Sequence, residues 1–147
     1  MTQSSLTPTY YNIADGVTAF STTRHGGVGQ GAYASFNINE WCGDDAQHIA
    51  ENRQLLADEL GLPSQHIIMP HQTHGIDTRI IAKEFVTLPD NIRRMLLEGV
   101  DAVMTDLPGV CIGVSTADCI PVLLYDEAHH AVCAIHAGWR GTAARIV

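Results

Sequence analysis

The stretch AVMTDLPGVCIGVSTADCIPVLLYDEAHHAVCAIH, residues 102–136, decides the fold class of this chain. It contains apolar runs rich in valine, isoleucine and leucine, and short polar or glycine-containing segments separate these runs. Short apolar runs bounded by turn residues are typical of buried β-strands. We therefore predict four buried strands with tight connections, over residues 102–105, 110–115, 121–124 and 131–135.

Other patterns upstream and downstream predict both helices and strands. Asp44 or Asp45 can cap a helix that runs to about Leu60, where Gly61 and Pro63 would end it. The remaining expected elements are a short amphipathic helix over 90–98, strands at 17–21, 67–69 and 76–81, and the first turns of a helix after residue 141. No repeat or linker divides the chain, so residues 1–147 are expected to form a single domain.

Composition limits the possible partners. The chain has 147 residues, of which 46% are hydrophobic and 16% charged, as in a compact globular protein. The formal net charge is −8, with only 8 lysines and arginines. A nucleic-acid groove or an anionic membrane surface needs concentrated positive charge, so we expect neither as a partner.

The N-terminal residues and the cysteines indicate the compartment. The sequence begins without the basic and apolar regions of a signal peptide, and no apolar run approaches the roughly 18 residues of a membrane span. The four cysteines, at 42, 111, 119 and 133, form neither a CxxC pair nor a dense disulfide framework. A cytoplasmic protein with reduced thiols is therefore expected.

Three short segments place a histidine or a cysteine at the end of a predicted strand or in the turn beside it. They are HQTHG at 71–75, STADC at 115–119 and HAGWRG at 136–141. Together they supply a His, Cys, His set that could hold a metal with one open position or form a Cys-His nucleophilic pair. Spacing alone does not choose between His71 and His74 as the first member.

Five motifs, in order along the chain, resemble the YfiH-like or laccase-domain family. These are Ser21-Thr22-Thr23-Arg24 with Gly26-Gly27-Val28, Ser35-Phe36-Asn37, Gln72-Thr73-His74-Gly75, Thr116 to Val122, and His136-Ala137-Gly138-Trp139-Arg140-Gly141. Members of this family are described as polyphenol oxidases in older usage. In newer usage they are described as purine nucleoside phosphorylases with adenosine deaminase activity.

The resemblance implies roles for individual residues. It makes His74, Cys119 and His136 the metal ligands, with His71 left as a residue of the substrate pocket. Arg24, Asn37 and Arg140 match motif positions near that site, and are candidates for contacting phosphate or the purine. Asp118 could act as an acid or base beside Cys119, or could only orient a ligand.

The resemblance also implies the fold and the completeness of the chain. The expected fold is α+β, with mixed β-sheets packed face to face and helices outside, in α/β/β/α layers. Family members continue well past the Trp-Arg-Gly motif, so the C-terminal part of the fold is expected to be absent here. Either the chain is then a fragment, or a second chain completes the fold.

The implied function is a metal-dependent phosphorylase that acts on adenosine, inosine or methylthioadenosine with phosphate, and also deaminates adenosine. One thiolate and two imidazoles suit zinc, which keeps a fourth position open. Copper is the alternative, because His₂Cys is also the equatorial set of blue-copper sites and would suit a polyphenol oxidase. A metal-free Cys-His hydrolase and a non-enzymatic interaction module are the remaining alternatives.

Overall fold

The computed structural model describes residues 6–147, which divide into two compact units on either side of the Ser64–Gln65 bond. The first unit has one long helix and a small antiparallel sheet. Its elements are β1 (Thr9–Tyr11), β2 (Ala19–Ser21), the 3₁₀ turn η1 (Gly31–Tyr33) and α1 (Ala46–Leu60). The strand β1 was not predicted, because three residues are too short to show a clear alternation.

The helix α1 confirms the predicted capping pattern. The Asp45 side chain accepts hydrogen bonds from the backbone N–H groups of His48 and Gln47, and these bonds lower the pKa of its carboxyl group. Gly61 ends the helix in the left-handed region at φ 66°, where glycine is favoured. Local sequence signals therefore determine both ends of this helix.

The side chain of Asn52 in α1 forms hydrogen bonds with the glycine-containing segment 27–37 of the first unit. This side chain is fully buried; its Oδ1 accepts from the Val28 N–H at 2.9 Å, and its Nδ2 donates to the carbonyls of Ser35 and Asn37. A Cβ atom at Gly27 would lie 2.4 Å from Asn52 Oδ1. The close approach of the segment to α1 therefore requires glycine at position 27.

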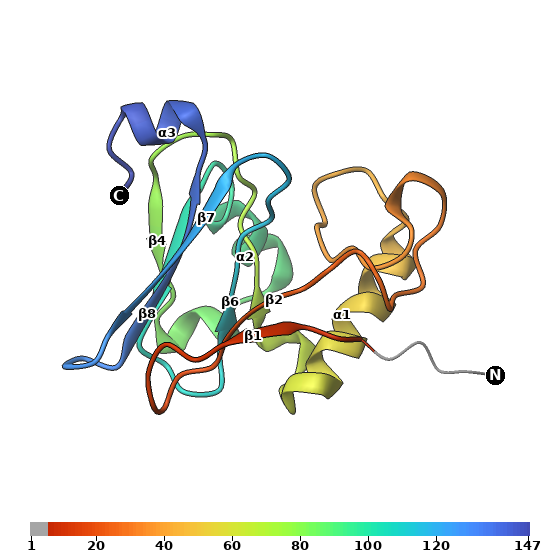
Figure 1. Ribbon diagram of the computed structural model, residues 1–147, viewed down its shortest axis with the longest axis horizontal. Helices are drawn as coiled ribbons and strands as arrows, with labels where there is room; N and C mark the ends of the chain where they lie inside the picture. Colours follow the sequence, from red (N-terminus) through yellow and green to blue (C-terminus); the bar gives the residue numbers. More distant parts are fainter. Residues whose placement is uncertain (1–5) are drawn as a thin grey trace. The chain divides into compact units, whose positions relative to one another are not determined.

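The second unit contains a four-stranded mixed sheet in the order β4-β5-β8-β7 (Figure 1). Its strands are β4 (Thr78–Ile80), β5 (Ala102–Thr105), β8 (Ala131–Ala137) and β7 (Ile120–Asp126). The pair β4-β5 is parallel, and the other two pairs are antiparallel. The remaining elements are η2 (Ser64–His66), which begins at the last residue of the first unit, β3 (Ile67–Ile68) paired in parallel with β6 (Cys111–Ile112), η3 (Lys83–Thr87), α2 (Asp90–Leu96) and α3 (Trp139–Ala143).

The two sheets of the second unit share one hydrophobic core. Val103 and Ala134 from the four-stranded sheet pack in the same buried cluster as Ile68 from β3 and Phe85 from η3. Arg79 Nε donates to the Leu96 carbonyl, which places α2 on this side of the sheet. The predicted α+β class with mixed sheets is confirmed.

Of the four strands predicted to be buried, β6 is only half-buried and β7 is largely exposed. In β7, Ile120 is 66% exposed and Leu124 48% exposed. The position of β7 in the sheet explains this exposure. Among the residues that the structure describes, β7 pairs only with β8 and so forms an edge of the sheet. The apolar composition of β7 predicted a buried strand, but the described residues of this chain leave it largely exposed.

No helix in the described part of the chain has both the length and the apolar character needed to cross a membrane.

Candidate metal centre

The predicted His, Cys, His set converges at one end of the four-stranded sheet. His74 lies in the turn before β4, Cys119 directly precedes β7, and His136 lies near the end of β8. Because β7 and β8 are antiparallel, with Pro121 opposite His136, the start of β7 meets the end of β8. The topology therefore brings together residues that are up to 62 positions apart (136 − 74).

The ligand atoms of His74, Cys119 and His136 all lie within 4.8 Å of one another. The two imidazole rings are edge to face, with centroids 4.8 Å apart. His136 is buried, Cys119 half-buried and His74 exposed, so the group is open on the His74 side. Within residues 6–147 it is the one group of three or more His, Cys, Asp or Glu side chains placed to share a metal ion.

Asp101 is a fully buried carboxylate that holds two of the three ligands in place. Its Oδ1 lies 2.8 Å from His136 Nδ1 and accepts from the His74 N–H at 2.9 Å. Its Oδ2 accepts from the N–H groups of Thr73 and Gly75, at 3.1 and 2.8 Å. A carboxylate can only accept, so Nδ1 of His136 carries the proton and Nε2 is the nitrogen left to bind an ion.

The hydrogen bonds to Asp101 also determine its charge. Burial alone would raise the pKa of this carboxyl group, but the bonds from His136 and from the N–H groups of Gly75, Thr73 and His74 outweigh burial and lower it. Asp101 is therefore ionised at neutral pH. The same bonds hold the turn at His74, whose φ of 63° lies in the left-handed region.

Gln72 connects the turn at His74 to the segment that leads to Cys119. Its Nε2 donates to the Ser115 carbonyl and its Oε1 accepts from the Ser115 N–H, both at 2.7 Å. Two short bonds to one backbone residue fix the distance between the segments. Gln72 thereby positions two ligand-bearing loops.

Gly138 leaves room for the three ligands. A Cβ atom there would lie 3.1 Å from His74 Cδ2, 3.2 Å from Cys119 Sγ and 3.8 Å from His136 Cε1. The backbone at Gly138 has φ −74° and ψ 168°, which any residue adopts. Space alone, not backbone conformation, therefore favours glycine at this position.

We expect Gly138→Val to weaken metal binding at least about tenfold, because its methyl groups displace His74 and Cys119 by several tenths of an ångström. Competition with a coloured chelator measures this change. Ala143→Val, at an exposed position of the same short helix, is the matched control and should bind as the parent does. Equal affinities for the two variants would show that the ligands tolerate the added volume.

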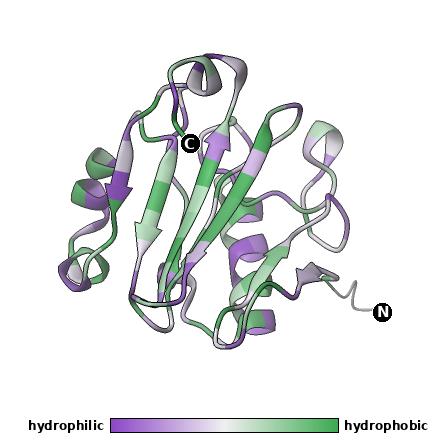
Figure 2. Ribbon diagram, turned by 60° about the vertical axis from the view of Figure 1, so that its left-hand side comes forward, coloured by the Kyte–Doolittle hydropathy of each residue, from purple (hydrophilic) through white to green (hydrophobic). Residues whose placement is uncertain are grey.

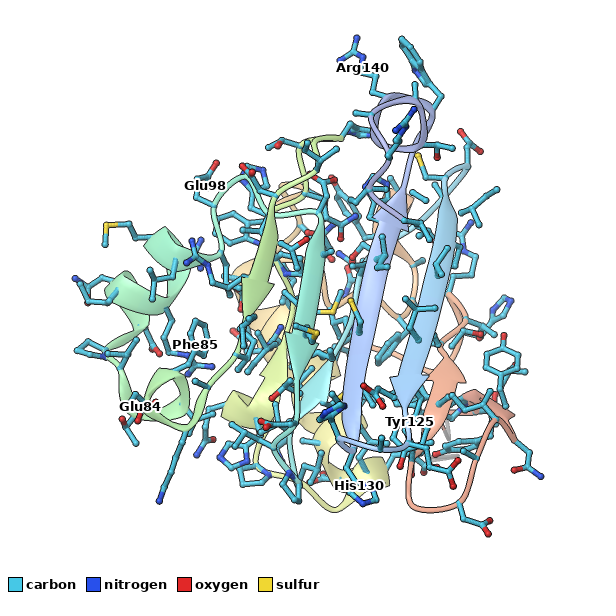
Figure 3. The ribbon with its side chains drawn as sticks, turned by 90° about the vertical axis from the view of Figure 1, so that its left-hand side faces the viewer. Glu84, Phe85, Glu98, Tyr125, His130 and Arg140 are labelled. Carbon is cyan, nitrogen blue, oxygen red and sulfur yellow. The ribbon has the colours of Figure 1, made fainter. Side chains whose placement is uncertain are left out.

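The other site residues predicted in the second unit lie outside the ligand group. His71 Nδ1 lies 2.8 Å from both carboxylate oxygens of Glu98, so His74 and not His71 stands in the group. Asp118 is exposed in the turn beside Cys119. The guanidinium of Arg140 lies 5.2 Å from the centre of the exposed Trp139 ring, at the end of the sheet where α3 begins (Figure 3).

Arg24 and Asn37 belong to the first unit, where their side chains bind their own loops. Arg24 donates from Nε and Nη2 to the Ala34 carbonyl, at 2.9 and 2.7 Å. Asn37 Nδ2 donates to an Asp44 carboxylate oxygen at 2.9 Å. Their predicted role in binding substrate remains a prediction.

Sequence reasoning missed Asp101. The available signal was its place in Gly99-Val100-Asp101-Ala102-Val103, where a single acid stands directly before a predicted buried strand. A charged residue at the start of a buried strand needs a partner there, and residues ending the neighbouring strands are the candidates.

Comparison with known proteins identifies the family. The family described as multi-copper polyphenol oxidoreductase laccase matches residues 18–147. The chain belongs to this family. A purine nucleoside phosphorylase of Bacteroides thetaiotaomicron is 44% identical to this laccase-family chain over 138 residues, which are 94% of the chain and 50% of that protein. A protein named adenosine deaminase RL5, from an unknown prokaryotic organism, is 44% identical over 90% of the chain and 50% of its own length.

Solved structures of proteins similar to this chain share its fold. YlmD from Geobacillus stearothermophilus superposes with a TM-score of 0.79 at 34% identity, over 90% of this chain and 49% of YlmD. YfiH from Bacillus licheniformis gives a TM-score of 0.76 at 30% identity, over 86% of this chain and 47% of YfiH. The chain therefore spans about half the length of the relatives it matches.

Proposed function

We propose that this chain carries the metal centre of a purine nucleoside phosphorylase. The observation that carries the proposal is the convergence of His74, Cys119 and His136 in a chain that is 44% identical to a protein of that name. Its substrates would be phosphate and a purine nucleoside such as adenosine, inosine or methylthioadenosine.

Zinc is the metal that the donor set supports best. One thiolate and two imidazoles make three protein ligands, and a zinc ion held by them would supply one open, Lewis-acidic position. Laccase chemistry instead requires several coppers held by many histidines. The single three-residue group found in the described part of the chain offers too few ligands for such a cluster.

The chain's own residues would supply the remaining groups for phosphorolysis. This reaction forms a bond from a phosphate oxygen to the ribose C1′ and breaks the bond from C1′ to the purine nitrogen. The protein must therefore hold an anion and deliver a proton to the departing base. We assign the phosphate to the exposed Arg140, four residues after His136, and proton transfer to Asp118, directly before Cys119.

Adenosine deamination is the second candidate reaction, supported by the similarity to the protein named adenosine deaminase RL5. Water would add at C6 of the purine, and the amino group would leave as ammonia with a proton that the site transfers from that water. The same residues would serve both reactions, since both place a purine nucleoside at the open, His74 side of the group.

The test combines metal analysis with product analysis. Protein purified without added metal is expected to carry about one zinc per chain. Incubation with adenosine, inosine or methylthioadenosine should release the free base only when phosphate is present. The Bacteroides thetaiotaomicron relative serves as the positive control for the assay.

Three results would contradict this function. A chain without stoichiometric metal, whose Cys119 reacts rapidly with a thiol reagent, would indicate a metal-free nucleophile. Bound copper together with oxidation of phenols would indicate a polyphenol oxidase. Bound zinc without turnover, both alone and together with the half of the relative that this chain does not match, would indicate a binding role.

A further inference from the structure

The short helix α3 packs against the turn that carries His74. Its residue Gly141 is buried, and a Cβ atom there would lie 2.9 Å from the carbonyl oxygen of Gly75, the residue that follows His74. This distance is shorter than ordinary van der Waals contact. Figure 1 and Figure 2 both show α3 across the end of the four-stranded sheet, and Figure 2 shows the apolar character of the central strands. The contact joins the segment after β8 to the ligand turn before β4.

Space, and not helical conformation, requires glycine at position 141. Gly141 lies inside α3, and in a helix alanine is favoured over glycine. The atom that a Cβ would meet first belongs to the backbone of Gly75, which cannot swing aside like the end of a flexible side chain. The next nearest atom is Cγ2 of Ile146, at 3.4 Å, and the Ile146 N–H donates to the Gly141 carbonyl at 2.9 Å. The turn and the segment after α3 therefore leave too little room for a methyl group at Gly141.

The turn that Gly141 contacts is also held by Asp101. The N–H groups of His74 and Gly75 donate to its two carboxylate oxygens, at 2.9 and 2.8 Å, and His74 has a φ of 63°. A residue other than glycine rarely adopts this conformation, so its surroundings must maintain it. Asp101 also holds the ring of His136. A shift of the turn therefore moves His74 relative to His136, the ligand that the same carboxylate orients.

Displacement of α3 would disturb the same ligands. The helix begins directly after Gly138, where a Cβ atom would lie 3.1 Å from His74 Cδ2 and 3.2 Å from Cys119 Sγ. The backbone at Gly138 thus has little freedom to move toward the ligands. A side chain at Gly141 must push either the turn at Gly75 or α3 itself, and both movements reach the ligand group.

We propose that Gly141 is a positioning residue for His74. Its close contact with the Gly75 carbonyl sets the direction in which the turn holds the His74 imidazole, and so sets the distance from that ring to the other two ligands. Gly141 acts through the backbone of Gly75 and would bind neither metal nor substrate. The effect on metal binding rests on the proposed function, whereas the effect on the turn is a property of the chain alone.

The Gly141→Ala variant tests this role. We expect zinc binding to weaken at least about tenfold, as when a group that orients a metal ligand is removed, although alanine by itself would favour the helix. Competition with a coloured chelator measures the affinity. In chain loaded with Co²⁺, the visible absorption bands report the ligand geometry, and these bands should shift. Ala143→Val adds volume at an exposed position of the same helix and is the matched control, which should keep the parent affinity and bands.

A second readout follows the turn in chain treated with a chelator. The amide hydrogens of His74 and Gly75 should exchange with deuterium severalfold faster in Gly141→Ala, because a displaced turn weakens their bonds to Asp101. The amide hydrogens of α1, in the first unit, should exchange at the parent rate, which shows that the variant remains folded. Ile146→Ala is a second variant, which removes volume beside Gly141 and cannot overpack it. Because α3 then loses a neighbouring side chain that supports it, exchange at Gly75 should again be faster.

The outcomes separate this inference from the proposed function. If the parent chain binds zinc and Gly141→Ala keeps the same affinity and cobalt bands, the inference is overturned and the proposed function is not affected. Faster exchange with unchanged metal affinity would also overturn it, since the position of His74 among the ligands would not depend on Gly141. A parent chain that binds neither zinc nor cobalt would contradict the proposed function. The exchange rates alone would then decide, and parent-like rates in both variants would overturn the inference.

Discussion

The Cys119→Ser variant is expected to lose stoichiometric metal. The thiolate is the one anionic ligand in the group, and a serine hydroxyl remains protonated at neutral pH and binds zinc poorly. The loss of affinity should exceed the roughly 10–100-fold effect that removing an outer partner of a ligand produces. Elemental analysis of the purified variant and competition with a coloured chelator both measure it.

Cys133→Ser is the matched control for this experiment. Cys133 is half-buried in β8, and burial raises the pKa of its thiol, so it is held as the neutral thiol. It is not in the ligand group, although it lies three residues before His136. The control should bind metal as the parent does, and equal losses in both variants would assign the effect to stability instead of ligation.

Local patterns predicted the secondary structure well where the deciding residues are neighbours in sequence. The helix α1 is an example: Asp45 caps its first turn and Gly61 ends it in the left-handed region. The strands β7 and β8 are another, because turn residues bound both apolar runs; their antiparallel pairing was not predicted. In both cases the residues that bound the element lie next to it in sequence.

Long-range properties were not predictable in the same way. The apolar sequence of β7 indicates a strand but not its position at the sheet edge, because strand order depends on pairing with β8 and on what lies beyond β7. The choice between His71 and His74 likewise depends on which side chain the turn directs toward Cys119 and His136. The buried carboxylate that fixes this turn, Asp101, lies 27 positions from His74 in sequence (101 − 74).

Replacing Asp101 with alanine is expected to damage both stability and metal binding. Four donors lose their acceptor at once: the N–H groups of Thr73, His74 and Gly75, and Nδ1 of His136. Leaving one buried and three part-buried donors unpaired should lower the free energy of unfolding by about 3 kcal/mol or more. The His136 ring also loses the bond that orients it, which should weaken metal binding roughly 10–100-fold.

Two further variants separate these effects of Asp101. Asp101→Asn retains one carbonyl oxygen but replaces the other with an NH₂ group that cannot accept, so its losses should be smaller than those of alanine. Asp126→Asn is the matched surface control: Asp126 also accepts from a histidine, His129 at 2.6 Å, but is exposed at the end of β7. Urea unfolding and chelator competition should show little change in this control. If Asp101→Ala kept the parent's metal affinity while losing stability, packing alone would orient His136, and the carboxylate would serve only the turn at His74.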